Sequence, residues 1–374
     1  MTALHTPVCD LFGVRYPIVQ TGMGFVSGPR LTAATANAGG LGILASATMS
    51  YSELAAAIEE TCSLTAEPFG VNLRADAPDA GQRVELLISR RVKVASFALA
   101  PRQELIARLK DAGVVVVPSV GARRHAEKVA AWGADAVVAQ GSEGGGHTGQ
   151  VATTVLLPQV VDAVDIPVIA AGGFFDGRGL AAALAYGAAG IAMGTRFLLT
   201  SDSPVPDAIK QRYLAATVAD TVVTSALDGV PQRLLRTAFA EQLARDTAAT
   251  RLLRSVRSAA AFRRLTGTTW RAMLREGLAM RRAHDLPLGQ VLLAANTPAL
   301  LRAAMVDGRT DFGVMATGQV TGLIEDLPSC AELIERIVSQ AEAVLAGLAG
   351  RNDAGAGDVQ DDGSLTGASE GAQP

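Results

Sequence analysis

The chain has 374 residues, of which 49% are hydrophobic, 18% charged and 4% aromatic, and its formal net charge is −3. This length allows a large core, and the near-neutral charge gives no reason to expect nucleic-acid binding. The cysteines Cys9, Cys62 and Cys330 lie far apart, which argues against a disulfide framework and a zinc site. Because the sequence contains neither a signal peptide nor an apolar run that could span a membrane, we expect a cytoplasmic protein.

Eight short apolar runs follow one another in the first half of the chain, separated by turns and helical patterns. In chain order they cover residues 16–20, 41–46, 69–73, 92–98, 114–120, 135–141, 167–173 and 190–197. The helical patterns between them include 28–40, 50–63, 101–113, 122–133 and 177–188. Strands that alternate with helices predict a parallel sheet, and eight such units favour a closed (β/α)8 TIM barrel. A doubly wound open sheet is the alternative architecture.

The alternation stops after Phe197, and residues 205–305 predict mostly helices and loops. Part of this region, residues 231–283, contains twelve arginines and only three acidic residues. The last residues are rich in Gly, Asp and Ser and nearly free of bulky apolar side chains, which is typical of disorder. We therefore predict an α/β barrel over 1–204, a helical arginine-rich lid over 205–310, a return to the barrel with a C-terminal helix over 311–349, and a disordered tail over 350–374.

Glycines gather at the carboxyl ends of the predicted strands, which is the end of a barrel that carries the active site. The loops after the seventh and eighth strands predict a phosphate site made of backbone N–H groups and a helix N-terminus. Its candidate residues are Gly172, Gly173, Gly194 and Thr195. Tight turning between strand and helix is the alternative explanation. The usual dinucleotide and P-loop signatures are absent from the sequence.

The loop after the first strand has the sequence "QTGMG" and suits a flat ring. Gly22 and Gly24 allow the main chain to lie against such a ring, and Met23 offers a packing surface for its face. Asn72 lies in the third predicted strand and can form hydrogen bonds with the edge of a heterocycle. An ordinary first turn and an Asn turn or cap are the alternatives.

The stretch "AQGSEGGGHTGQ", residues 139–150, places one titratable ring, His147, among glycines. Histidine exchanges a proton near neutral pH, and glycine permits close approach of a ligand. The stretch therefore indicates a proton-transfer group beside a bound cofactor or substrate, and a mobile surface turn is the alternative. The nearby Glu143 either orients His147 or is solvated. We predict no metal site.

The motifs "PIVQTGMG", "ATANAGGLGILAS", "PFGVNL", "GADAVVAQGSEGGGHTG", "PVIAAGGFFDGRG" and "GIAMGTRF" together resemble the nitronate monooxygenase family, whose members are FMN-dependent barrels. The resemblance implies that His147 is the catalytic histidine, that Gly145 and Gly146 approach the flavin ring, and that Gln319 lies near it. It also implies that the residues after the first, seventh and eighth strands hold the ring and the phosphate of FMN. Some members carry a lysine at the end of the fifth strand, where this chain has Ser119. This serine version resembles the enoyl-acyl-carrier-protein reductase II branch, which weakens the case for nitronate oxidation.

The chain resembles most closely an actinobacterial branch of the family that acts in the degradation of steroid C and D rings. This resemblance implies a dehydrogenase that introduces a C=C bond into a hydroxy-methyl-oxo-indane carboxyl-CoA ester. NAD is the candidate electron acceptor, and a homo-oligomer is the candidate assembly. The alternative functions are nitronate monooxygenase, an enoyl-thioester reductase II-like activity, and a flavin- or acyl-CoA-binding regulator.

A CoA ester carries several phosphate charges, and arginine binds phosphate in a bidentate manner. The arginine-rich segment therefore predicts contacts with the CoA phosphates. The candidate residues are Arg251, Arg254, Arg257, Arg263 and Arg264. A helical cover whose arginines are solvated or paired with the barrel is the alternative explanation.

Overall fold

The computed structural model describes residues 4–98, 100–245 and 288–355. Eight parallel strands close a barrel, and the closure is made by β1 and β9, where Ile18 is in register with Ile191. This closure confirms the predicted TIM barrel and rules out the open sheet. The strands are β1 (Ile18–Gln20), β2 (Leu41–Ala45), β3 (Phe69–Leu73), β4 (Val94–Phe97), β5 (Val115–Val120), β6 (Val137–Gln140), β8 (Val168–Ala171) and β9 (Gly190–Met193).

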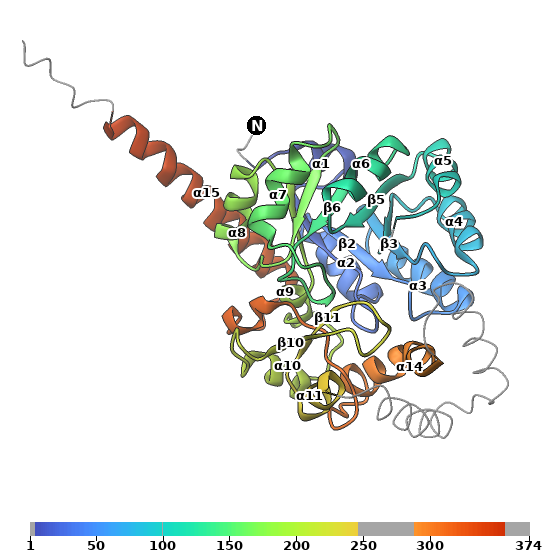
Figure 1. Ribbon diagram of the computed structural model, residues 1–374. Coiled ribbons are helices and arrows are strands. Elements are labelled where there is room, and N and C mark those ends of the chain that lie inside the picture. The colour runs from blue at the N-terminus through green and yellow to red at the C-terminus, as the bar shows by residue number, and fades with distance from the viewer. Residues whose placement is uncertain (1–3, 99, 246–287, 356–374) are drawn as a thin grey trace, which may run out of the picture.

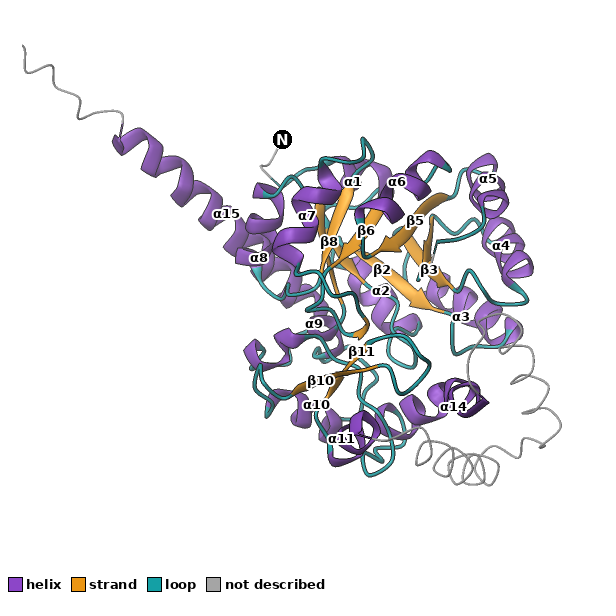
Figure 2. Cartoon of the chain, viewed as in Figure 1, coloured by secondary structure: helices purple, strands orange, loops and turns teal. Residues whose placement is uncertain are grey.

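Helices follow the strands and surround the barrel (Figure 2). Some of them begin at start signals in the sequence: Ser50 and Glu53 form a capping box at the first turn of α3, and Asp176 caps α8. The surrounding helices are α1 (Pro7–Phe12), α2 (Pro29–Asn37), α3 (Tyr51–Leu64), α4 (Ala80–Ser89), α5 (Gln103–Asp111), α6 (Arg123–Ala131), α7 (Thr153–Val161) and α8 (Gly177–Ala185).

The last helix, α15 (Cys330–Gly355), packs against α8 and α2 and so completes the ring of helices around the barrel (Figure 1). Gly177 of α8 lies so close to the α15 backbone that a Cβ there would be 2.5 Å from the nitrogen of Ala341. The helix continues to Gly355, past position 350, where we expected the tail to begin. Residues 350–354 contain no proline, so nothing in their covalent structure stops a helix that is already formed.

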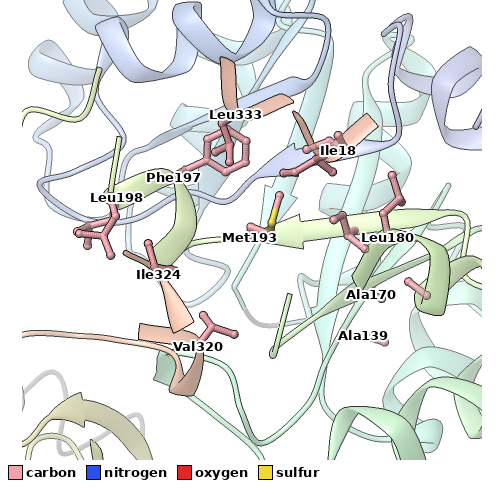
Figure 3. Packing of buried hydrophobic residues seen from close by; sticks show 14 of the residues in the cluster. Ile18, Ala139, Ala170, Leu180, Met193, Phe197, Leu198, Val320, Ile324 and Leu333 are labelled. Atoms are coloured by element: carbon pink, nitrogen blue, oxygen red, sulfur yellow. The ribbon is translucent and has the colours of Figure 1, made fainter. Parts of the chain in front are cut away.

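The largest hydrophobic cluster fills the space between the barrel wall and the helices that cover it. Ile18 and Met193 contribute from strands, Leu180 from α8 and Leu333 from α15, as Figure 3 shows. A second set of residues fills the barrel interior, with Val19, Ile43, Val94, Val117 and Ile169 among its members. Because side chains of a strand alternate between two faces, these interior residues identify which positions point into the barrel mouth.

The chain after β9 forms a smaller region beside the barrel (Figure 1), where we had expected helices and loops. It also contains an antiparallel hairpin of β10 and β11, which the sequence reading missed because each strand has only four residues and shows no clear period. β11 pairs in turn with β7, a short strand in the loop after β6. The elements are β7 (Gly146–His147), α9 (Thr195–Leu198), α10 (Asp207–Leu214), β10 (Thr221–Thr224), β11 (Gln232–Leu235), α11 (Ala238–Arg245), α14 (Leu288–Met305) and the 3-10 helix η1 (Gln319–Leu323).

Among the described helices, none combines the length and the apolar composition that crossing a membrane requires.

Candidate active site

The last inward-facing positions of the strands divide the barrel mouth into a half lined by polar side chains and a half lined by small side chains. We call these the polar half and the small half. On β3 to β6 these positions are polar, and Asn72 donates a hydrogen bond from Nδ2 to Ser96 Oγ at 3.3 Å. In the neighbouring strands the residues in register with them are alanines. The polar positions are Asn72, Ser96, Ser119 and Gln140, and the alanines are Ala45, Ala171 and Ala192.

The loop after β1 is shaped by its own hydrogen bonds. The Gln20 amide donates to Ser27 Oγ at 2.8 Å, and the same oxygen accepts the N–H of Met23 at 2.9 Å. At Gly22 a Cβ would lie 2.6 Å from the Cβ of Asn72, so the loop packs directly against β3. The structure therefore brings together the residues that we predicted to face a flat ring.

The loop after β9 meets the β1 loop at the small half of the mouth, and the loop after β8 lies against the loop after β6. Gly172 and Gly173 both have left-handed backbone angles, with φ of +93° and +87°. A Cβ on Gly194 would lie 3.4 Å from Met23 Sδ, which places the β9 loop against the β1 loop. Thr195 opens the short helix α9, and its Oγ1 accepts the backbone N–H of Gly318 at 2.8 Å.

The glycines before His147 differ in what surrounds them. A Cβ on Gly145 would lie 2.5 Å from the carbonyl carbon of Thr317, so this glycine is required by packing within the protein. Gly146 has φ of +65°, and no atom of the described residues lies within 4 Å of the place of its Cβ. Gln319 joins the same cluster because its backbone N–H donates to the Glu143 carbonyl at 2.9 Å.

The Glu143 side chain contradicts both of our expectations, because it neither orients His147 nor lies free in solvent. Its carboxylate accepts the backbone N–H of Thr153 at 3.0 Å and the Thr153 hydroxyl at 2.8 Å. Thr153 is the first residue of α7, and the positive end of a helix dipole favours a carboxylate. Glu143 therefore fixes the loop after β6 to the helix that follows it.

His147 has an acidic partner that the sequence reading missed. Its Nε2 lies 2.7 Å from Oδ2 of Asp228, and the same oxygen accepts the side-chain N–H of Gln232 at 2.7 Å. Burial alone would raise the pKa of Asp228, but the bonds to His147, Gln232 and the Val230 N–H outweigh it and hold that pKa below the ordinary value. The "DG" pair at 228–229 is a turn signal, but it does not reveal which side chain the aspartate meets.

The backbone of His147 is held from two sides. Gln140 donates from Nε2 to the His147 carbonyl at 2.6 Å, and Thr148 donates its N–H to the Pro231 carbonyl at 3.0 Å. In the ladder between β7 and β11, His147 is in register with Gln232. The ring itself stays 59% exposed, so a substrate can reach it.

The five candidate arginines of the segment after α11 lie outside the described residues, and their contacts stay a prediction. They are Arg251, Arg254, Arg257, Arg263 and Arg264.

Comparison with known proteins assigns this mouth to a family. The family model for nitronate monooxygenase matches residues 5–83 and 80–340. The chain is 64% identical over 341 residues to the (3aS,4S,5R,7aS)-5-hydroxy-7a-methyl-1-oxo-octahydro-1H-indene-4-carboxyl-CoA dehydrogenase of Mycobacterium tuberculosis (strain ATCC 25618 / H37Rv), covering 90% of this chain and 96% of that protein. It is 60% identical over 341 residues to the protein of the same name from Rhodococcus jostii (strain RHA1), covering 91% and 97%.

A solved structure supports the same assignment. FabK from Thermotoga maritima shares the fold with a TM-score of 0.77 and 35% sequence identity, and the match covers 93% of this chain and all of that one. The family model itself extends over the barrel strands, the hairpin and the first part of α15. The chain belongs to the nitronate monooxygenase family.

Proposed function

We propose that this protein is an FMN-dependent dehydrogenase that introduces a C=C bond into the CoA thioester of a steroid-derived hydroxy-methyl-oxo-indane carboxylic acid. The observation that carries the proposal is the identity of 64% and 60%, over nine-tenths of the chain, to two proteins named for that dehydrogenation. Membership of the family implies a flavin cofactor. The choice of FMN, and of NAD as the final electron acceptor, belongs to the proposal.

The mouth of the barrel fits a flavin. On its small half, Gly172, Gly173 and Gly194 leave backbone rather than side chains at the surface, next to the first turn of α9. N–H groups at the start of a helix and in a glycine turn suit a phosphate group. On the polar half, Asn72 presents an amide that can bind the edge of a heterocycle. These residues would hold FMN, which supplies a hydride acceptor when it is bound.

Dehydrogenation of a thioester needs a base, because the thioester carbonyl acidifies the proton on its α-carbon. That proton and a hydride from the β-carbon must both leave for the double bond to form. We assign the proton to His147, since its ring is exposed at the mouth while its backbone is fixed by β11 and Gln140. Histidine suits this task because its charge changes near neutral pH.

The CoA part of the substrate is assigned to the arginine-rich segment. If some of Arg251, Arg254, Arg257, Arg263 and Arg264 hold the CoA phosphates, their neutralisation raises the KM for CoA esters and leaves the flavin content unchanged. The KM should also rise with salt, because exposed charge pairs are screened. An equal effect on a small nitronate substrate would contradict this assignment. The cytoplasmic location and a homo-oligomeric state stay predictions.

Anaerobic bleaching of the bound flavin tests the proposed reaction. The purified protein is mixed without oxygen with the indane carboxyl-CoA ester, with other CoA esters and with alkyl nitronates. We expect rapid bleaching by the indane ester and release of FMN, rather than FAD, on denaturation. Bleaching by nitronates alone, with oxygen uptake in air, would instead assign nitronate oxidation. A bound flavin that none of these compounds reduces would favour a binding regulator.

A further inference from the structure

We propose that Asp228 is the positioning residue of His147, and that it fixes the tautomer in which Nε2 carries the proton and Nδ1 is the free base. This inference rests on the proposed function, in which His147 receives the α-proton of the substrate. It assigns a role in proton transfer to the hairpin of β10 and β11, a part of the chain that the sequence predicted to be a helical lid and substrate region.

The hydrogen bond between His147 and Asp228 can have only one direction when Asp228 is ionised. An ionised carboxylate has no proton to donate, so the 2.7 Å contact between Asp228 Oδ2 and His147 Nε2 requires the proton on Nε2. In neutral imidazole only one nitrogen carries a proton, and the other then has a free electron pair. Nδ1 is therefore the atom that can accept a proton from the substrate.

The carboxylate of Asp228 is itself held in place. The side chain of Asp228 is 19% exposed, and its two oxygens have separate partners. Oδ2 accepts from Gln232 Nε2 at 2.7 Å, and Oδ1 accepts from the Val230 N–H at 3.1 Å. The buried Gln232 is thus a second donor to Oδ2. Its Nε2 also lies 3.2 Å from His147 Nε2, a contact that is a hydrogen bond only in the opposite tautomer, in which Nε2 accepts. The 2.7 Å contact of Nε2 with the carboxylate is shorter and charge-assisted, so it favours the tautomer with the proton on Nε2.

Charge also matters around the pair of His147 and Asp228. Arg74 follows β3 directly and is bonded to Asp76, and its guanidinium interacts electrostatically with Asp228. Because the Arg74 charge is already paired with Asp76, the ionised form of Asp228 is favoured chiefly by its bonds to His147, Gln232 and the Val230 N–H. When Nδ1 takes a proton, the ring becomes an imidazolium, and the carboxylate at Nε2 stabilises the new positive charge. The same group therefore serves the ring before and after the transfer.

The Asp228→Asn variant tests the inference, because it keeps the shape and can keep the Val230 bond. Its amide can donate to Nε2, which would move the ring proton to Nδ1 and remove the base. Loss of a positioned base costs about 10²- to 10⁴-fold, so we expect loss of its positioning residue to slow flavin reduction by about 10- to 10²-fold. The KM for the CoA ester should stay unchanged, and Asp228→Glu should recover part of the rate.

A second measurement does not depend on turnover. Nitrogen-15 spectra of protein labelled at histidine distinguish the two tautomers, and the chain has only four histidines, so His147→Ala assigns the signal. We expect a protonated Nε2 and a bare Nδ1 in the native protein, and loss of this pattern in Asp228→Asn. The matched control is Asp220→Asn, which removes a carboxylate that binds Thr217 rather than His147.

The outcomes separate this inference from the function on which it rests. If His147→Ala slows reduction but Asp228→Asn changes neither the rate nor the tautomer, the positioning role is wrong and the base assignment stands. If His147→Ala leaves the reduction rate unchanged, the base assignment itself is wrong. In the His147→Ala background, Asp228→Asn should cost nothing further, because the two residues act as one unit; a further loss would also contradict the inference.

Discussion

The two sides of the barrel mouth are formed by different groups, loop backbone on one side and hydrogen-bonded side chains on the other. On the side of β8, β9 and β1, glycines bring loop backbones together, and the surface that remains is mainly backbone. On the side of β7 and the hairpin, side chains of His147, Asp228 and Gln232 form a connected set of hydrogen bonds. We therefore expect changes on the glycine side to affect cofactor binding, and changes on the side of β7 and the hairpin to affect the rate of proton transfer.

The largest effect is expected on the glycine side, from Gly194→Asp. The new side chain would begin 3.4 Å from Met23 Sδ and 3.2 Å from Thr21 Oγ1, and its charge would face the phosphate that we place there. We expect purified protein without flavin, measured by absorbance and by reconstitution with added FMN. The control is Gly81→Asp, since no atom of the described residues lies within 4 Å of that Cβ position, apart from those of its chain neighbours and its own helix backbone. A yellow Gly194→Asp protein would mean that the phosphate binds elsewhere.

The next effect is expected on the side-chain side, from His147→Ala. The variant should keep its fold and its flavin, because the backbone bonds of residue 147 do not need the ring. Flavin reduction by the CoA ester should be slower by about 10²- to 10⁴-fold. Stopped-flow absorbance under nitrogen measures this rate, with the exposed His125→Ala on α6 as control. A variant that loses its flavin would erase the distinction between the two sides.

A smaller effect is expected from Gln232→Met. This change removes one of the two side-chain donors to Asp228 Oδ2 and replaces it with an apolar side chain of similar length. A hydrogen bond to a charged group contributes about 1.5–3 kcal/mol, but the bond from His147 to the same oxygen remains. We therefore expect a fall in the reduction rate smaller than that of Asp228→Asn. A larger fall would identify Gln232 as the principal partner of the ring.

The smallest effect is expected on the free energy of unfolding and its dependence on pH. Since folding holds the pKa of Asp228 below its ordinary value, the ionised group stabilises the folded state above its unfolded-state pKa. That contribution is lost as the pH falls through the folded-state value. Urea unfolding should show Asp228→Asn less stable than the native chain at neutral pH, by on the order of 1 kcal/mol. The difference should shrink toward acid pH, and a constant difference would mean that the carboxylate charge does not matter.

The barrel could be predicted from the sequence because its signals are local. Each strand is a short apolar run followed by a turn and a helix, and no knowledge of distant contacts is needed to recognise the pattern. The hairpin could not be predicted in this way, since "TVVT" and "QRLL" are too short to show a period. The two strands pair with each other, and β11 also pairs with the distant β7. The missed strand pairing explains why Asp228 was missed, since the ladder brings positions 81 residues apart into contact.

The glycines illustrate a second limit of the sequence. The sequence does not distinguish a glycine that lies against a ligand from a glycine that lies against another segment of the chain. Gly22 and Gly145 are tightly packed against Asn72 and Thr317, whereas Gly146 adjoins open space. Only the fold separates these cases. Glu143 is similar, because its bond to the start of α7 depends on how the loop after β6 turns back on itself.

The position of α15 has a consequence for the synthesis of the protein. All eight barrel strands have been made once Met193 leaves the ribosome, yet the helix that covers α8 and α2 begins only at Cys330. Until then, the face of α8 against which α15 packs in the finished molecule lacks the apolar residues of α15, such as Leu333 and Ile337. Exposed apolar surface on a growing chain promotes aggregation and chaperone binding. The outer cover of α8 and α2 is therefore added only after residue 330 has been made, well after the last strand of the barrel.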